Sequence, residues 1–243
     1  MTPLTVLPLL FATQAAIDHT TALFDAIRKG DAAQVQALMT AEPKLAGARN
    51  SDGATPALWA AYTRHADLAP LVLAGREPDF FEACALGRSE RAADLLAHDA
   101  RLIDAYSADG FTPLGLAVFF GHEEIARRLV AAGAVVNRPS RNAIRVTPLH
   151  SAVESGSLAL LDLLLAHGAH ADPVEFLGAT PLDSAAARGS RKMVDRLLKA
   201  GADPRRKTND GKTAIDLARQ YGHEALAVYL AGYSSPAAGS DGK

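Results

Sequence analysis

One pattern of apolar positions recurs seven times along the chain. Each copy starts at an anchor residue and carries an apolar residue two positions later, an alanine five positions later and another apolar residue seventeen positions later. The anchors stand at positions 21, 55, 78, 112, 147, 180 and 213, and the alanines are Ala26, Ala60, Ala83, Ala117, Ala152, Ala185 and Ala218. Recurrence at a nearly fixed period predicts a fold of stacked repeats.

The copy that begins at Thr147 shows the local structure that the pattern predicts. Thr147 can cap a helix with its hydroxyl group, and Pro148 suits the first helical position. Apolar residues at helical spacing then form one face of a two-turn helix, which Gly156 ends. A second helix follows, and the residues expected to face inward on it are Leu160, Leu161, Leu164 and Leu165.

The segment "TPLHSA" at 147–152 resembles the ankyrin repeat, and so do the Gly-Ala pairs at 133–134, 168–169 and 201–202. The resemblance implies an all-α fold, an α-solenoid of about seven helix-turn-helix repeats joined by short hairpin links. We expect the repeat domain to cover residues 20–232, between an N-terminal extension (1–19) and a disordered C-terminal tail (233–243). The resemblance also implies a scaffold that binds other proteins.

Two departures from the period change this picture. The copies starting at 21 and 55 recur, shifted by 57 residues, as those starting at 78 and 112, so the N-terminal half has the form of a duplicated unit with one kind of link after copies one and three. Copy two is followed after only 23 residues by copy three, and Pro70 falls in its second helix. We expect a truncated hairpin there, with Pro70 in the first turn, and a notch or bend in the stack.

Composition and charge exclude several classes of function. The chain has 243 residues, 49% of them hydrophobic, and a net charge of −2, so nothing predicts nucleic-acid binding. The single cysteine, Cys84, indicates a reducing compartment, and we expect a cytoplasmic monomer. Arginine outnumbers lysine by 18 to 7, which is typical of a bacterial-type protein. We expect no membrane insertion: the apolar segment 6–12 is too short for a bilayer span, and as a signal peptide it lacks a basic residue before it.

Candidate catalytic and metal-binding residues do not form a recognisable set. Cys84 falls at a packed position of its repeat. The resemblance implies structural roles for His150 and for the histidines that follow the first helix of a copy, His65, His122 and His223. His167 and His170 could face one metal, but no cysteine or carboxylate joins them at ligand spacing. We therefore expect no enzyme, no cofactor and no metal site.

The variable positions of the repeats predict a binding surface. Seven and eight residues after each anchor the copies differ from one another, so packing does not fix these side chains, and in the resembling family they line a concave groove. With the tips of the links they give the expected partner-binding residues: Tyr62, Tyr106, Asp109, Phe111, Phe119, Phe120, Arg141, Phe176, Arg188 and Tyr221. We expect one ring of the Phe119–Phe120 pair to be mostly buried and the other exposed, and Phe120→Ala to weaken partner capture without unfolding the domain.

Two other functions are consistent with the sequence. A small-molecule sensor or an enzyme could use the notch at the truncated second repeat, with a pocket near Tyr62, Arg76 and Phe80. A structural spacer or homo-oligomer needs no groove at all. The link at 137–148, with Arg138, Arg141 and Arg145, is either a solvated loop or a basic finger for an acidic partner.

Overall fold

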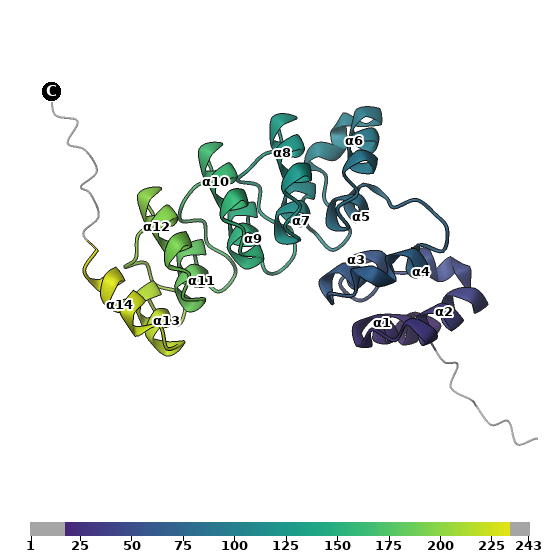
Figure 1. Ribbon diagram of the computed structural model, residues 1–243, viewed down its shortest axis with the longest axis horizontal. Helices are drawn as coiled ribbons and strands as arrows, with labels where there is room; N and C mark the ends of the chain where they lie inside the picture. The colour runs from purple at the N-terminus through teal and green to yellow at the C-terminus, as the bar shows by residue number, and fades with distance from the viewer. Residues whose placement is uncertain (1–17, 234–243) are drawn as a thin grey trace, which may run out of the picture.

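The computed structural model describes residues 18–233, and all regular secondary structure in that range is helical (Figure 1). Most of the expected N-terminal extension (residues 1–17) lies outside the described residues. The expected C-terminal tail also lies outside them, except for residue 233. The α-helices are α1 (His19–Lys29), α2 (Ala32–Ala41), α3 (Pro56–Tyr62), α4 (Ala69–Leu73), α5 (Phe80–Ala85), α6 (Ser89–His98), α7 (Pro113–Phe119), α8 (Glu123–Ala131), α9 (Pro148–Ser155), α10 (Leu158–Ala166), α11 (Pro181–Ala187), α12 (Arg191–Lys199), α13 (Ala214–Gln220) and α14 (Glu224–Ala231), with 3-10 helices η1 (Pro43–Gly47), η2 (Ala66–Leu68) and η3 (Ala100–Asp104).

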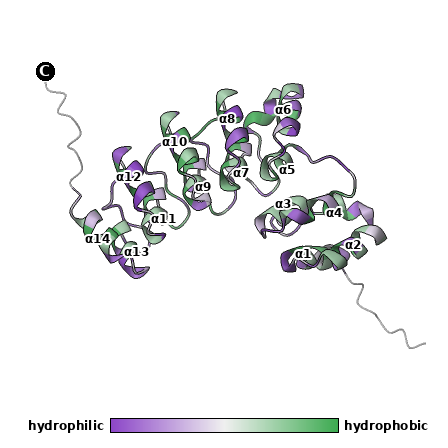
Figure 2. Ribbon diagram, in the orientation of Figure 1, coloured by the Kyte–Doolittle hydropathy of each residue, from purple (hydrophilic) through white to green (hydrophobic). Residues whose placement is uncertain are grey.

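The helices form consecutive pairs that stack into an arch. In Figure 1 the first helices of the pairs, α5, α7, α9 and α11, lie on the concave side, and their partners α6, α8, α10 and α12 lie on the outer side. The expected all-α solenoid is confirmed. In Figure 2 helix α12 is largely hydrophilic, whereas α3 and α5 are mostly apolar. The links after copies one and three each contain a 3-10 helix, η1 and η3, as the duplicated unit predicts.

Threonine anchors cap five of the seven first helices. The hydroxyl of Thr112, for example, accepts a hydrogen bond from the N–H of Gly115 at 3.0 Å, and Pro113 occupies the first turn. Copies one and three differ, because Asp18 and Asp79 are their caps. The anchor pattern therefore places these two helix starts wrongly, since an aspartate carboxylate three positions earlier or one position later takes over the capping role.

A histidine after the first helix locks each of three copies onto the copy before it. His122 lies over Gly87 and donates a hydrogen bond from Nε2 to the carbonyl of Ala85 at 2.9 Å. His65 and His223 occupy the same place over the corresponding glycines. The expected structural role of these histidines is confirmed.

The closeness of this contact makes Gly87 sensitive to substitution. Gly87 and Gly121 both adopt left-handed backbone, with φ of 72° and 77°, but a Cβ at Gly87 would lie 2.7 Å from the His122 ring, whereas one at Gly121 would meet nothing within 4 Å. In both Gly→Ala variants, backbone strain lowers the unfolding free energy by about 1–2 kcal/mol. We expect Gly87→Ala to lose at least about 1 kcal/mol more, because of the collision with the ring. Urea denaturation of both variants checks this, and equal losses would contradict it.

The hydrophobic core divides at copy two. One buried cluster lies within residues 23–73 and the other extends from Ala54 to Leu230. Helix α3 contributes to both, with Ala57 and Ala60 in the first cluster and Leu58 and Ala61 in the second. The fold thus has two packed units that share α3.

The expected truncation at copy two is confirmed. The second helix of the copy is only η2 followed by the short α4, and Pro70 lies in the first turn of α4. Residues 74–79 alone connect α4 to α5, and Ala74 is forced into left-handed backbone with φ of 49°. Helix α4 is turned away from α6 (Figure 1), whereas α6, α8, α10 and α12 pack in sequence. The solenoid therefore bends at this link.

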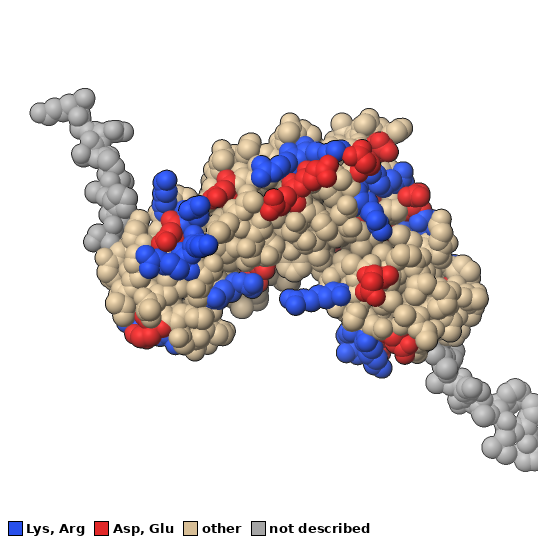
Figure 3. All heavy atoms as spheres, in the orientation of Figure 1, with Lys and Arg blue, Asp and Glu red and all other residues tan. Residues whose placement is uncertain are grey.

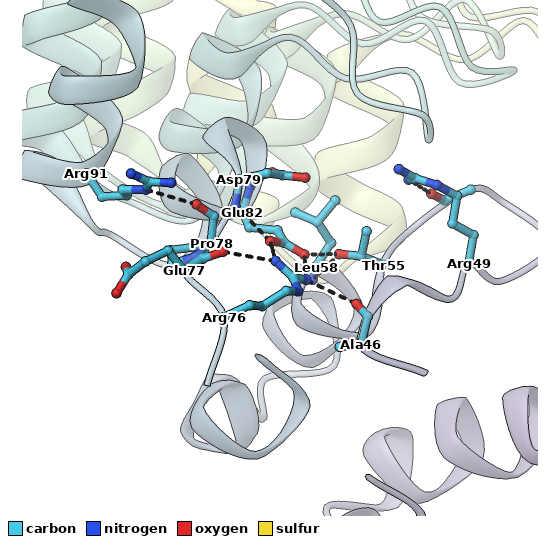
Figure 4. Close-up of polar contacts among 11 residues, drawn as sticks. Ala46, Arg49, Thr55, Leu58, Arg76, Glu77, Pro78, Asp79, Glu82 and Arg91 are labelled. Carbon is cyan, nitrogen blue, oxygen red and sulfur yellow. Dashed lines mark hydrogen bonds and ion pairs between the residues drawn. The ribbon is translucent and has the colours of Figure 1, made fainter. Parts of the chain in front are cut away.

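A buried ion pair fastens the bend (Figure 4). The guanidinium group of Arg76 donates two hydrogen bonds of 2.6 Å to the carboxylate of Glu82, whose side chain is fully buried, and another of 3.1 Å to the carbonyl of Ala46. The same carboxylate accepts hydrogen bonds from the Thr55 hydroxyl at 2.7 Å and the Asp79 backbone N–H at 2.9 Å. This junction network joins α5 to η1 and to the start of α3.

The junction network makes stability depend on pH. Burial by itself raises the pKa of the Glu82 carboxyl, but hydrogen bonds from Arg76 and Thr55 outweigh burial and hold that pKa below its ordinary value of 4.5. A lowered pKa contributes stability above the ordinary value, and this contribution is lost as the pH falls through the folded-state pKa. We expect the difference in unfolding free energy between wild type and Glu82→Gln to be largest near neutral pH and to shrink in acid. Urea denaturation across a pH series measures it, and a constant difference would contradict the prediction.

Candidate partner-binding groove

A groove of about 710 Å³ opens on the concave side of the arch. The space-filling view is hollowed along the corresponding edge, between the two ends of the molecule (Figure 3). Side chains of α3, α7, α9 and α11 and of four links line what we call the concave groove: Asp52, Ala54, Trp59, Tyr62, Asp109, Phe111, Leu116, Phe119, Asn142, Ala143, Ile144, Val146, His150, Ser151, Glu154, Glu175 and Ser184. The lining is mostly apolar and comes from copies two, four, five and six and their links.

Aromatic side chains from copies two and four meet at one end of this groove. The Tyr62 ring lies 6.0 Å from Phe111, 6.3 Å from Phe119 and 5.3 Å from Phe120, centroid to centroid. The ring of Phe119 is 41% exposed and lines the groove. Phe120 is half-buried, packs on Tyr62 and does not line the groove. One ring is more exposed than the other, as expected, although Phe120 is half-buried and not mostly buried. Phe120 packs on Tyr62 and lies outside the groove lining, and its assignment to the binding surface stays a prediction.

Hydrogen bonds hold Tyr62 in place. Its hydroxyl donates to the carboxylate of Asp109 at 2.8 Å, and the Ser107 hydroxyl donates to the other carboxylate oxygen. Burial and the charge of Asp109 raise the pKa of Tyr62 far above its ordinary value. Asp109 lines the groove with only 7% of its surface exposed, so its main role is to orient Tyr62.

Removing the hydroxyl of Tyr62 tests this role. Tyr62→Phe keeps the ring packing on Phe120 but leaves one oxygen of the Asp109 carboxylate without its donor. We expect a loss of about 1–3 kcal/mol in unfolding free energy, the cost of an unsatisfied buried charged acceptor. Urea denaturation measures the loss, and Tyr221→Phe, on a ring that is 57% exposed, is the matched control with no expected change. A negligible loss for Tyr62→Phe would show that water replaces the hydroxyl.

Other expected binding residues lie outside the lining. Tyr106 accepts the stacked guanidinium groups of Arg138 and Arg141, 4.9 and 4.1 Å from its ring centroid, and donates a hydrogen bond to the carbonyl of Pro139 at 3.0 Å. Arg141 is exposed on the link and stacks on Tyr106. Tyr106 and Arg141 therefore brace the long link.

The remaining expected residues lie around the groove or away from it. Arg188 forms an ion pair of 3.2 Å with Glu154, a lining residue, so it adjoins the groove. Phe176 is 64% exposed at a link tip, and its N–H donates to the carbonyl of Ile144 at 2.9 Å. Tyr221, on copy seven, is exposed and is not part of the lining.

Sequence reasoning missed several lining residues. Glu154 stands at one of the variable positions and could have been chosen from that signal, but Glu175 and Ile144 belong to links of irregular length, where the repeat pattern gives no register. Trp59 lies one helical turn before Tyr62, and its indole N–H donates to the carbonyl of Phe24 at 3.0 Å. The tryptophan, on copy two, therefore links one end of the groove to copy one.

Reactive groups have structural surroundings. Cys84 is fully buried, and burial raises the pKa of its thiol to about 12, so the expected core position is confirmed. His150 lies in the capping box of α9, where its Nε2 is 3.3 Å from the carbonyl of Ala179, and burial lowers its pKa. Between residues 18 and 233, no group of three or more metal-ligating side chains comes together. His167 instead lies 2.8 Å from the Leu163 carbonyl through Nδ1.

The outer face carries paired charges. Figure 3 shows basic and acidic side chains next to one another along the ridge of outer helices. Arg128 pairs with Glu90 at 2.8 Å and Glu124 at 2.7 Å, and Arg196 pairs with Asp162 at 2.8 Å. Within the described part of the chain, no helix is both long and apolar enough to cross a bilayer.

Comparison with known sequences agrees with the fold. The sequence model of a family described as "Ankyrin repeats (3 copies)" matches residues 80–175 and 136–208, which together cover just over half of the chain. The chain belongs to the ankyrin-repeat family. Ankyrin repeats are generally protein–protein interaction modules and are typically non-enzymatic. The matched residues start at α5, so α1–α4, before the bend, are assigned to the same architecture by their structure.

Curated relatives share short segments of this ankyrin-repeat chain. It is 45% identical over 64 residues to mouse "Protein fem-1 homolog A-like", a match that covers 26% of this chain and 10% of that protein. It is 37% identical over 90 residues to human "Ankyrin repeat and KH domain-containing protein 1", covering 37% of this chain and 4% of the relative. The similarity thus spans at most a tenth of either relative. The bacterial-type origin expected from composition stays a prediction.

Proposed function

We propose that this chain is a non-catalytic adaptor or regulator that binds a segment of a partner protein in the concave groove, as a cytoplasmic monomer. The observation that carries the proposal is the groove itself, an apolar hollow of about 710 Å³ with two large exposed side chains in its lining, Phe119 and Ile144. Exposed aromatic residues beside a pocket are typical anchors of protein interfaces. The buried thiol of Cys84 suits a reducing compartment.

Affinity capture with matched variants tests the proposal. Extract from the native cells is passed over immobilised wild type, Phe119→Asp and Val228→Asp. Val228 is 61% exposed on α14, outside the lining, so its variant changes the surface equally without touching the groove. We expect proteins retained by wild type and Val228→Asp to be lost on Phe119→Asp. Retention by all three would contradict the proposed groove, and light scattering of the purified chain tests the monomer.

The sensor or enzyme at the notch has less support. It requires Arg76 and Phe80 to face a ligand, but Arg76 is held by Glu82 and Phe80 is 3% exposed. Tyr62 faces the concave groove and not the link at residues 74–79. We therefore propose that the notch serves to bend the solenoid and to bring copies two and four together at the groove.

A further inference from the structure

The lining of the concave groove is acidic as well as apolar. It contains four carboxylates, Asp52, Asp109, Glu154 and Glu175, and no lysine or arginine. The whole chain has a net charge of only −2, so negative charge is concentrated in this groove. A surface of one sign attracts partners of the opposite sign.

Two of these carboxylates already have partners. Asp109 accepts hydrogen bonds from Tyr62 and Ser107, and Glu154 pairs with Arg188 at 3.2 Å. Glu175 has neither kind of partner: within residues 18–233 its carboxylate forms no ion pair and no side-chain hydrogen bond. The carboxylate of Asp52 is unpaired as well within these residues, but Asp52 is exposed, whereas Glu175 is half-buried. Glu175 is therefore the lining carboxylate best placed to receive a cation from outside.

The surroundings of Glu175 strengthen the attraction between its carboxylate and a cation. The residue is half-buried on the link between copies five and six. Partial burial, and then the nearby charge of Glu154, raise the pKa of its carboxyl. A carboxylate that is both desolvated and repelled by a neighbour is stabilised by an incoming ammonium or guanidinium group.

Exposed apolar side chains share the groove with this carboxylate. Ile144 and Phe119, 50% and 41% exposed, line the same groove. Phe176 follows Glu175 directly, and its backbone N–H is bonded to the carbonyl of Ile144. The groove therefore offers an apolar contact next to an unpaired negative charge.

We infer that the partner of the concave groove is a peptide segment in which a lysine or arginine stands beside a large apolar side chain. The cation contacts Glu175, and the apolar side chain packs on Phe119 and Ile144. This inference rests on the proposed function, because it names the chemistry of the segment that the groove holds. The same lining repels acidic peptides and the phosphates of nucleic acids.

Selection from a random peptide library tests the inference. Short peptides displayed on phage are selected on wild type, counter-selected on Phe119→Ala, and the enriched peptides are synthesised for fluorescence polarisation. We expect them to share Lys or Arg close to Leu, Ile, Phe or Trp. We also expect Glu175→Gln to weaken their binding about 3–10-fold, as loss of one interfacial ion pair does. When citrulline replaces the peptide's arginine, or norleucine its lysine, wild type and Glu175→Gln should bind equally.

A control and two contrary outcomes make the test decisive. Glu77→Gln changes an exposed glutamate whose side chain points away from the junction network (Figure 4) and should leave affinity unchanged. Two outcomes would overturn this inference and leave the proposed function standing. In the first, the selected peptides lack basic residues. In the second, their binding is lost on Phe119→Ala but is unchanged by Glu175→Gln. Selection that yields no peptide dependent on Phe119 would overturn both.

Discussion

Arg76→Ala is expected to lower the unfolding free energy by about 3 kcal/mol, the low end of the cost of breaking a buried ion pair. The Glu82 carboxylate is fully buried and would keep only the Thr55 and Asp79 donors. The loss stays at the low end because the Arg76 side chain is already 34% exposed, so water can enter the space that it leaves. Urea denaturation followed by circular dichroism measures the loss. Hydrogen exchange should show it first in α1–α4, because the junction network fastens that unit to α5.

An equivalent ion pair on the surface provides the control. Arg101 also makes two hydrogen bonds to a carboxylate, 2.8 and 2.9 Å to Asp99, but its side chain is 91% exposed. Arg101→Ala should therefore leave the unfolding free energy almost unchanged, because water and salt screen an exposed ion pair. Arg76→Lys, which keeps the charge without the paired geometry, should fall between wild type and Arg76→Ala. Similar losses for Arg76→Ala and Arg101→Ala would show that the junction network does not hold the bend.

The repeat pattern predicted the helices well because each copy depends on its own sequence. Threonine caps, proline at the first helical position and glycine at the helix end act within a few residues of each other, so copies four to six were predictable in detail. The bend was predictable as well, because the anchors of copies two and three are only 23 residues apart, which leaves no room for a hairpin link between them. Local rules failed only where Asp18 and Asp79 displaced the anchor as cap.

The candidate groove was less predictable because its contacts join distant copies. Tyr62 and Asp109 are 47 residues apart, and the bend brings their copies together across copy three. No pattern in either copy reveals that contact, so Asp109 was expected at the surface although it is buried. Similarly, Glu82 and Arg76 are ordinary charged residues in sequence, and only the packing of α5 against η1 and α3 makes them a buried pair.

Phe119→Ala should mainly weaken partner binding, whereas Phe120→Ala should mainly lower the stability of the fold. Phe119 is exposed in the groove, so its loss should weaken partner binding by at least about 2 kcal/mol, roughly 30-fold in Kd, with little change in stability. Phe120 packs on Tyr62 at 5.3 Å between centroids and on the second core cluster. Its loss should lower the unfolding free energy by about 2–3 kcal/mol, somewhat less than for a fully buried phenylalanine.

Both effects can be measured on the same two proteins. Fluorescence polarisation with a captured partner or a selected peptide gives Kd, and urea denaturation gives stability, for each variant beside wild type. Phe120→Leu is the matched control for packing, because it keeps apolar volume against Tyr62 and should recover much of the lost stability. If Phe120→Ala instead weakened binding without loss of stability, Phe120 would belong to the binding surface after all. Both rings would then bind the partner, and the packing of Tyr62 on Phe120 would not contribute to the unfolding free energy.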